Sequence, residues 1–166
     1  MMMLDKHTIP ITILICDDDE DDRMLTQQAL EDAHISNALR FVEDGEQLLD
    51  YLYQRGAFAG ETGAAPRPGL ILLDLNMPTM DGREALRHIK QDPTLLDIPI
   101  VVLTTSSLDE DVIRSYRLGV NSFITKPVTF SGLVEAMNVL GRYWLEIVEL
   151  PPIPARAVAR RARLGR

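Results

Sequence analysis

The stretch GLILLD, residues 69–74, decides the fold of this chain. Its four consecutive apolar residues leave no polar face, so a strand formed by them must be covered on both sides. The later stretch IPIVVLT, residues 98–104, is nearly as apolar. Strands of this kind occur in parallel sheets that carry helices on both faces. The two stretches therefore predict an α/β fold with a central parallel sheet.

The rest of the chain alternates between strand and helix patterns. Strands are predicted at residues 9–16, 38–43, 69–74, 98–103 and 121–125. Helices are predicted at residues 21–33, 45–55, 81–91, 109–117 and 129–147. The last helix places five apolar side chains on one face, which predicts a core position for Leu133, Met137, Leu140, Trp144 and Ile147. Five strands and five helices in alternation predict a doubly wound open sheet with right-handed crossovers.

Composition excludes several classes of protein. The 166 residues are 46% hydrophobic and 25% charged, as is usual for one globular domain. No apolar run approaches the roughly 20 residues of a membrane span, and the start lacks the apolar core of a signal peptide. Cys16 is the single cysteine, so an internal disulfide is impossible and we expect a core role for this residue. These features predict a cytoplasmic protein.

Charge is distributed unevenly along the chain. The net charge is −8, of which five arginines after residue 149 contribute +5, so the preceding residues carry −13. Such an acidic body argues against nucleic acid as the main partner. We therefore divide the chain into an N-terminal tail at 1–8, a domain at 9–147 and a Pro/Arg-rich extension at 148–166. Within the domain, the Gly/Ala/Pro-rich loop at 56–69 is expected to be exposed and mobile.

Ligands of doubly wound sheets bind beyond the carboxyl ends of the strands. The residues predicted there are Asp17 and Asp18, Asp74, Thr104 and Thr105, and Lys126 followed by Pro127. Three carboxylates suit a hard divalent cation such as Mg²⁺ or Mn²⁺. The hydroxyl and the ammonium group suit a phosphoryl group, and one carboxylate can act as a nucleophile to give an aspartyl phosphate.

The acidic run ICDDDEDD, residues 15–22, divides into two parts. Asp17 and Asp18 are predicted metal ligands, whereas Glu20 to Asp22 are predicted to begin a helix, whose N-terminus favours negative charge. Asp19 fits either part. A calcium-binding EF-hand is excluded because the sixth position of the loop, counted from Asp17, is not glycine.

These pieces together resemble the receiver domain of response regulators, of the chemotaxis (CheY-like) type. The resemblance covers residues 9–147 and rests on the acidic pair, D-x-N-M-P-x-M-D-G from Asp74, V-x-L-T before the fourth helix, and Lys126-Pro127. It implies a flavodoxin-like sheet of order 2-1-3-4-5. It also implies a signalling module that catalyses only its own phosphorylation and dephosphorylation, rather than an enzyme with a separate substrate.

The resemblance assigns a role to each matching position. Asp74 corresponds to the phosphoacceptor, and Asp17 and Asp18 hold Mg²⁺ together with Asp74 and the backbone carbonyl of Asn76. Thr104 bonds the phosphoryl group and Lys126 pairs with it. Phe123 corresponds to the switch aromatic residue that moves with Thr104. The bond from Lys126 to Pro127 is expected to be cis, and Thr105 is hypothesised to slow phosphate loss.

A closer resemblance concerns the loop at 56–69, the segment REALRHIKQDPTLLDIPIVVLTTS and the ending RYWLEIVELPPIP. These stretches are similar to single-domain regulators of bacterial and cyanobacterial phytochrome kinases. The similarity implies a sensor histidine kinase as partner, possible homodimers through the face of the fourth helix, fifth strand and fifth helix, and output by protein contact without a DNA-binding domain or a membrane.

Two alternatives stay open. A haloacid-dehalogenase-like phosphatase also uses an aspartate nucleophile and Mg²⁺ at strand ends, but Asp21 does not fit the last position of its Asp-x-Asp-x-Thr/Val signature. A receiver-like scaffold that is never phosphorylated would not need the complete set of Asp17, Asp18, Asp74, Thr104 and Lys126.

Overall fold

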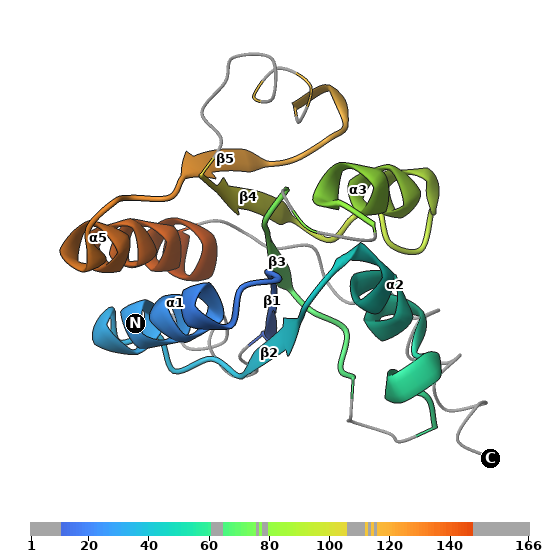
Figure 1. Ribbon diagram of the computed structural model, residues 1–166, viewed down its shortest axis with the longest axis horizontal. Coiled ribbons are helices and arrows are strands. Elements are labelled where there is room, and N and C mark those ends of the chain that lie inside the picture. The colour runs from blue at the N-terminus through green and yellow to red at the C-terminus, as the bar shows by residue number, and fades with distance from the viewer. Residues whose placement is uncertain are drawn as a thin grey trace, which may run out of the picture.

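A five-stranded parallel sheet forms the centre of the protein (Figure 1). The computed structural model describes residues 11–60, 65–75, 77, 80–105, 112, 114 and 116–147, without the side chains of 146 and 147. The strands are β1 (Ile13–Cys16), β2 (Leu39–Val42), β3 (Leu70–Leu73), β4 (Ile100–Thr104) and β5 (Ser122–Thr125). They pair in the order β2-β1-β3-β4-β5, which confirms the predicted fold class and strand order.

Helices cover both faces of the sheet. They are α1 (Glu20–Asp32), α2 (Gly45–Tyr53), α3 (Gly82–Gln91) and α5 (Phe130–Gly141), with a 3-10 helix η2 at Gly56–Phe58. Figure 1 shows α1 and α5 on one face and α2 and α3 on the other. Of the helix predicted at 109–117, residues 112, 114, 116 and 117 are helical, and the others lie outside the described residues. Within the described part of the chain, no helix combines the length and apolarity needed to cross a membrane.

The alternation of side chains along each strand builds two hydrophobic clusters. Leu14 and Cys16 of β1 belong to the cluster beneath α2 and α3, whereas Ile13 and Ile15 belong to the cluster beneath α1 and α5. Because every residue of β1, β3 and β4 is buried, these strands need cover on both faces. Each buried Val, Leu or Ile side chain in these strands contributes roughly 1.5–3 kcal/mol by leaving water. The continuous apolar runs of the sequence are thus explained.

Cys16 is a core residue, as expected, with 1% of its surface exposed. Burial, followed by the negative charges of Asp44, Asp17, Asp74 and Asp18, raises the pKa of its thiol well above the ordinary value. Its Sγ lies 3.4 Å from Sδ of Met77. The neutral thiol is therefore a packing group rather than a nucleophile.

The last helix differs from the prediction at its C-terminal end. Leu133, Met137, Leu140 and Trp144 pack into the cluster beneath α1 and α5, as predicted. The α-helix nevertheless ends at Gly141 and continues as a π-helix, η3 (Arg142–Ile147). Glycine weakens a helix interior, and here a Cβ at Gly141 would lie 2.8 Å from Cδ1 of Ile35. The close approach to the residues after α1 thus coincides with the change of helix type.

The loop at 56–69 is partly packed against the domain. Hydroxyl and amide groups of Tyr51 and Gln54 donate hydrogen bonds to the carbonyls of Pro66 (2.8 Å) and Ala65 (3.1 Å). Ala65 is only 2% exposed, so the prediction of exposure was wrong for this end of the loop. The sequence did not reveal these partners, because the donors lie 15 and 11 positions before their acceptors. Their hydrogen bonds fix the part of the loop that leads into β3. Residues 61–64 lie outside the described residues.

Candidate functional site

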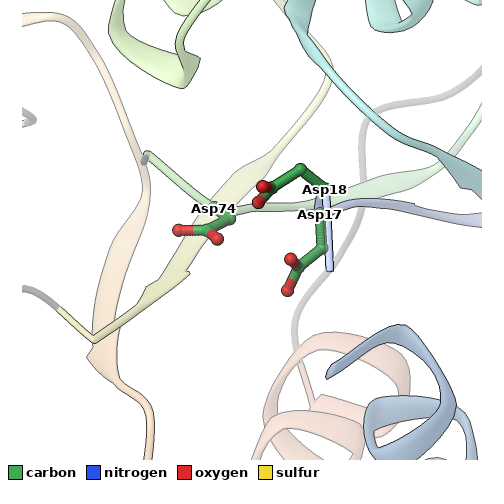
Figure 2. A group of neighbouring side chains, drawn as sticks. All are labelled: Asp17, Asp18 and Asp74. Atoms are coloured by element: carbon green, nitrogen blue, oxygen red, sulfur yellow. The ribbon is translucent and has the colours of Figure 1, made fainter. Parts of the chain in front are cut away.

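The site lies where β1 and β3 end side by side. Asp17 directly follows β1 and Asp74 directly follows β3. The Asp74 N–H donates to the carbonyl of Cys16 at 2.9 Å, and the Asp17 N–H donates to the carbonyl of Val42 at 3.1 Å. Because the sheet hydrogen bonds extend to these two residues, their backbones are fixed relative to each other. Figure 2 shows the carboxylates of Asp17, Asp18 and Asp74 gathered in one small region.

The three carboxylates fit a divalent cation. One oxygen from each of Asp17, Asp18 and Asp74 lies within 4.8 Å of the others. Asp17 is 3% exposed and Asp74 is 8% exposed, whereas Asp18 is exposed. Carboxylate oxygens, with a position open to water, are the ligands that Mg²⁺ and Mn²⁺ prefer. The set can therefore hold such an ion.

Lys126 brings a positive charge to this cluster from the end of β5. Its backbone N–H donates to the carbonyl of Thr104 at 2.8 Å, which ties it to the end of β4. Its Nζ lies 2.6 Å from Oδ2 of Asp17, 3.2 Å from Oδ2 of Asp22 and 3.7 Å from Oδ2 of Asp74. We call Asp17, Asp18, Asp74 and Lys126 the acidic rim. One ammonium group thus meets two carboxylates of the predicted metal set, Asp17 and Asp74, and a third carboxylate, Asp22, from outside it.

Opposing effects set the pKa values in the acidic rim. Burial alone would lower the pKa of Lys126, but its hydrogen bond with Asp17 and the charges of Asp17, Asp74 and Asp22 raise it above the ordinary value. Burial raises the pKa of Asp17, and the hydrogen bonds from Lys126 and from the Asp19 N–H only partly offset this effect. The lysine is therefore firmly charged, and the aspartate is under electrostatic strain that a bound cation would relieve.

The acidic run is resolved residue by residue. Asp19 is the N-cap of α1, because its Oδ1 accepts from the N–H groups of Asp21 (2.8 Å) and Asp22 (3.1 Å). Glu20, Asp21 and Asp22 form the first turn, as predicted. The prediction for Asp22 was incomplete, because its side chain also pairs with Lys126. Sequence distance hid this contact, since the two residues are 104 positions apart.

Two further supporting residues were not predicted. Arg23 donates from Nη1 to the carbonyl of Asp17 at 2.8 Å and so fixes the start of α1 against the end of β1. Gly82, which ends the D-x-N-M-P-x-M-D-G motif, packs against the backbone of Asp74. A Cβ at Gly82 would overlap the Asp74 carbonyl oxygen and would lie 2.9 Å from Cα of Leu75. The Asp-Gly pair before α3 was the available signal, but it did not reveal this close approach.

The remaining predicted residues have distinct positions. Thr104 ends β4 and is fully buried, at the same edge of the sheet as the acidic rim. Thr105 is exposed. Phe123 is partly buried and packs against the cluster beneath α2 and α3. Asn76 lies outside the described residues, so its predicted carbonyl ligand is not placed.

The bond between Lys126 and Pro127 corrects one expectation. No peptide bond among the described residues is cis, so this bond is trans and the prediction of a cis bond was wrong. The trans isomer is intrinsically favoured before proline by about 0.5–1 kcal/mol. Lys126 reaches Asp17 with the trans bond in place.

Known proteins match most of the chain. Residues 13–138 match the family model of the response regulator receiver domain. Over 149 residues, the chain is 42% identical to response regulator Rcp1 of a Synechocystis strain, which covers 90% of this chain and 99% of Rcp1. These matches extend over nearly all of the described residues.

Solved structures agree with the sequence matches. The crystal structure of the phosphorylated cyanobacterial phytochrome response regulator RcpA has a TM-score of 0.79 and 41% identity, covering 87% of this chain and 100% of RcpA. The Mn²⁺-bound form of Rcp1 has a TM-score of 0.77 and 43% identity, covering 86% and 100% of the two chains. From its family match, its relatives and its fold, the chain belongs to the response regulator receiver family and is a receiver of phosphorelay signalling.

Proposed function

We propose that this receiver accepts a phosphoryl group on Asp74 from a phosphohistidine of a sensor histidine kinase and releases it by hydrolysis. The observation that carries the proposal is the position of Asp74, buried at a strand end with two more carboxylates and the Lys126 ammonium group around it. The fold holds the Asp74 carboxylate close to the other two carboxylates despite their mutual repulsion. This arrangement suits a nucleophile better than a structural ion pair.

The proposed transfer is a displacement at phosphorus. An oxygen of Asp74 forms the new P–O bond while the P–N bond to the donor imidazole breaks, and the imidazole leaves with the electron pair. Lys126, whose Nζ lies 3.7 Å from Asp74 Oδ2, offsets the negative charge of the incoming group. Thr104, buried at the end of β4, offers a hydroxyl donor to a phosphoryl oxygen. Attack of water on phosphorus later breaks the P–O bond to Asp74, which releases inorganic phosphate and restores the carboxylate.

Asp17, Asp18 and Asp74 would hold a Mg²⁺ or Mn²⁺ ion, together with the backbone carbonyl of Asn76. When bound, such an ion supplies charge neutralisation between the anionic nucleophile and the anionic donor. The fit rests on the three carboxylate oxygens within 4.8 Å of one another. The acidic rim carries more buried negative charge than positive charge, and a bound cation would offset this excess.

The partner is proposed to be a phytochrome-type sensor kinase, because the relatives named above include a phytochrome response regulator. Phosphorylation would draw Thr104 and Phe123 inward and alter the face formed by residues 109–117, β5 and α5. Partner binding or homodimer formation through that face would then carry the signal. Both the kinase type and the dimer are properties proposed for this chain from its relatives and its family.

The test uses a small phosphodonor in place of the kinase. Acetyl phosphate with Mg²⁺ is expected to add one phosphoryl group, detected by intact mass and removed by hydroxylamine, and Asp74→Asn is expected to abolish the addition. Wild-type protein that stays unmodified, or an Asp74→Asn variant that is still modified, would contradict the proposal. Repeated turnover of small phosphate esters that depends on Asp17 would instead support a phosphatase.

A further inference from the structure

We propose that Asp22 is a positioning residue that holds the Lys126 ammonium group beside Asp74, an inference that rests on the proposed function. Lys126 has three N–H donors at Nζ. Its neighbours are Asp17, Asp22 and Asp74, at 2.6, 3.2 and 3.7 Å. Of these three carboxylates, Asp22 alone stands outside the group that can hold a metal ion.

The division of labour follows from this difference. Asp17 already uses both oxygens, because Oδ1 accepts from the Asp19 N–H at 3.0 Å and Oδ2 accepts from Lys126. A cation held by Asp17 and Asp74 competes with Lys126 for the same two carboxylates. Asp22 does not share in that competition, so its pairing with Lys126 persists in the presence of the cation. A lysine side chain loses much rotamer entropy when it is ordered, and a lasting partner keeps it ordered.

Asp22 is itself held in place by the start of α1. Its backbone N–H donates to Oδ1 of the N-cap Asp19 at 3.1 Å. The next residue, Arg23, donates to the carbonyl of Asp17 at 2.8 Å and so anchors the same turn to the end of β1. The Asp22 carboxylate is therefore presented to Lys126 from a rigid element. Its side chain is 40% exposed, so water partly screens the pair and the effect of losing it is small.

The alternative is that Asp22 is one more negative charge near the site. In that case its removal would lower the repulsion of an anionic donor and would speed phosphorylation. The positioning role predicts the opposite sign. Asp21 provides the matched control, because it lies in the same turn and carries the same charge, and it is exposed.

The first measurement does not need a phosphodonor. In ¹⁵N NMR spectra, we expect the Lys126 ammonium signal, assigned with Lys126→Met, to exchange with water about two- to fivefold faster in Asp22→Asn than in wild type, the range for a partly exposed ion pair. Asp21→Asn is expected to leave the exchange unchanged, and Asp22→Glu to restore most of it. Unchanged exchange in Asp22→Asn, with wild-type amide spectra, would overturn the proposal.

The second measurement is the rate of phosphorylation by acetyl phosphate at saturating Mg²⁺. Asp22→Asn is expected to be about two- to fivefold slower than wild type, whereas Asp21→Asn is expected to equal or exceed it. An Asp22→Asn rate at or above that of Asp21→Asn would overturn the positioning role. A wild-type protein that takes up no phosphoryl group would overturn the proposed function instead, and the ammonium signal would still decide whether Asp22 holds Lys126.

Discussion

At the carboxyl ends of the strands, one lysine, Lys126, pairs with the three aspartates 17, 22 and 74. Towards the C-terminal ends of α2 and α3, by contrast, Asp50 and Asp92 each have partners of their own. Asp50 pairs with Nε of Arg55 at 2.7 Å. Asp92 accepts from the Tyr53 hydroxyl at 2.6 Å on one oxygen and from Thr94 on the other. We call these contacts the far-end pairs. A helix that connects two parallel strands ends at the edge of the sheet opposite to the carboxyl ends of those strands.

The two regions differ in burial as well as in balance. The side chains of Asp17 and Lys126 are 5% and 12% exposed, compared with 28% and 57% for Asp50 and Arg55. In the acidic rim, buried carboxylates outnumber the cation, so the fold tolerates an electrostatic cost that a ligand can relieve. In the far-end pairs, Asp50 has a cation of its own and Asp92 has hydrogen-bond donors, and water screens these exposed contacts. They stabilise local structure, and the hydrogen bond from Tyr53 to Asp92 joins α2 to α3. The same residue type thus carries unbalanced buried charge at one end and stabilises local structure at the other.

The largest effect is expected from Lys126→Met in a buffer that contains a chelator. The change leaves the buried carboxylate of Asp17 without its closest cation, and the free energy of unfolding should fall by about 3 kcal/mol. Urea denaturation measures the loss, and Arg55→Met is the matched replacement at the far end. Equal losses in the two variants would break the distinction between the regions.

Metal binding is expected to stabilise the folded protein through the acidic rim and not through the far-end pairs. At a Mg²⁺ or Mn²⁺ concentration about 100 times the dissociation constant, the free energy of unfolding should rise by about 2.7 kcal/mol. Asp18→Asn should remove most of this rise, since Asp18 is exposed and its loss costs the fold little. The measurement is thermal unfolding with and without the metal ion, and Asp21→Asn is the charge-matched control. A rise that survives Asp18→Asn would place the ion elsewhere.

Gly82→Ala should damage both stability and function. The added Cβ has no room beside the Asp74 carbonyl, and overpacking of this kind costs about 1–3 kcal/mol. Displacement of Asp74 should also slow its phosphorylation in the fraction that remains folded. Gly45→Ala is the control, because its Cβ would lie 2.7 Å from the Met80 carbonyl oxygen instead. A similar loss of phosphorylation in both variants would show that general destabilisation is the cause.

Asp22 and Gly82 show which contacts of the site can be predicted from the sequence and which cannot. The apolar runs of β3 and β4 predict the parallel sheet, and topology then places Asp17, Asp74 and Lys126 at one edge. The partner of Asp22 and the neighbour of Gly82 depend on how α1 and α3 pack, which no local pattern encodes. The end of α5 at Gly141 has the same origin, since it coincides with contact to Ile35. Strand ends are thus readable from sequence, whereas contacts between distant elements are not.

Arg55→Met should have a small effect that salt removes. An ion pair as exposed as Arg55 and Asp50 contributes about 0.2–1 kcal/mol at low ionic strength, together with the stacking of the guanidinium group 5.0 Å from the centre of the Tyr53 ring. Repeating the urea denaturation in about 1 M salt, where the screening length is about 3 Å, should reduce the difference from wild type. A loss as large as that of Lys126→Met would mean that the far-end pairs are not merely local.

The smallest effect concerns Tyr53 and is visible only in alkali. Burial, then the hydrogen bond to Asp92 and its charge, raises the pKa of Tyr53 to about 12, against an ordinary value of 10.0. Tyr53 loses its proton at a higher pH in the folded state than in the unfolded state. Its contribution to the free energy of unfolding is therefore fully present below pH 10 and is lost as the pH rises towards 12. Tyr53→Phe should therefore flatten the fall in unfolding free energy between pH 10 and 12, measured by urea denaturation, while Tyr143→Phe, at an exposed tyrosine of α5's continuation, should not. A Tyr53→Phe variant with the wild-type alkaline slope would show that Asp92 does not hold the phenol neutral.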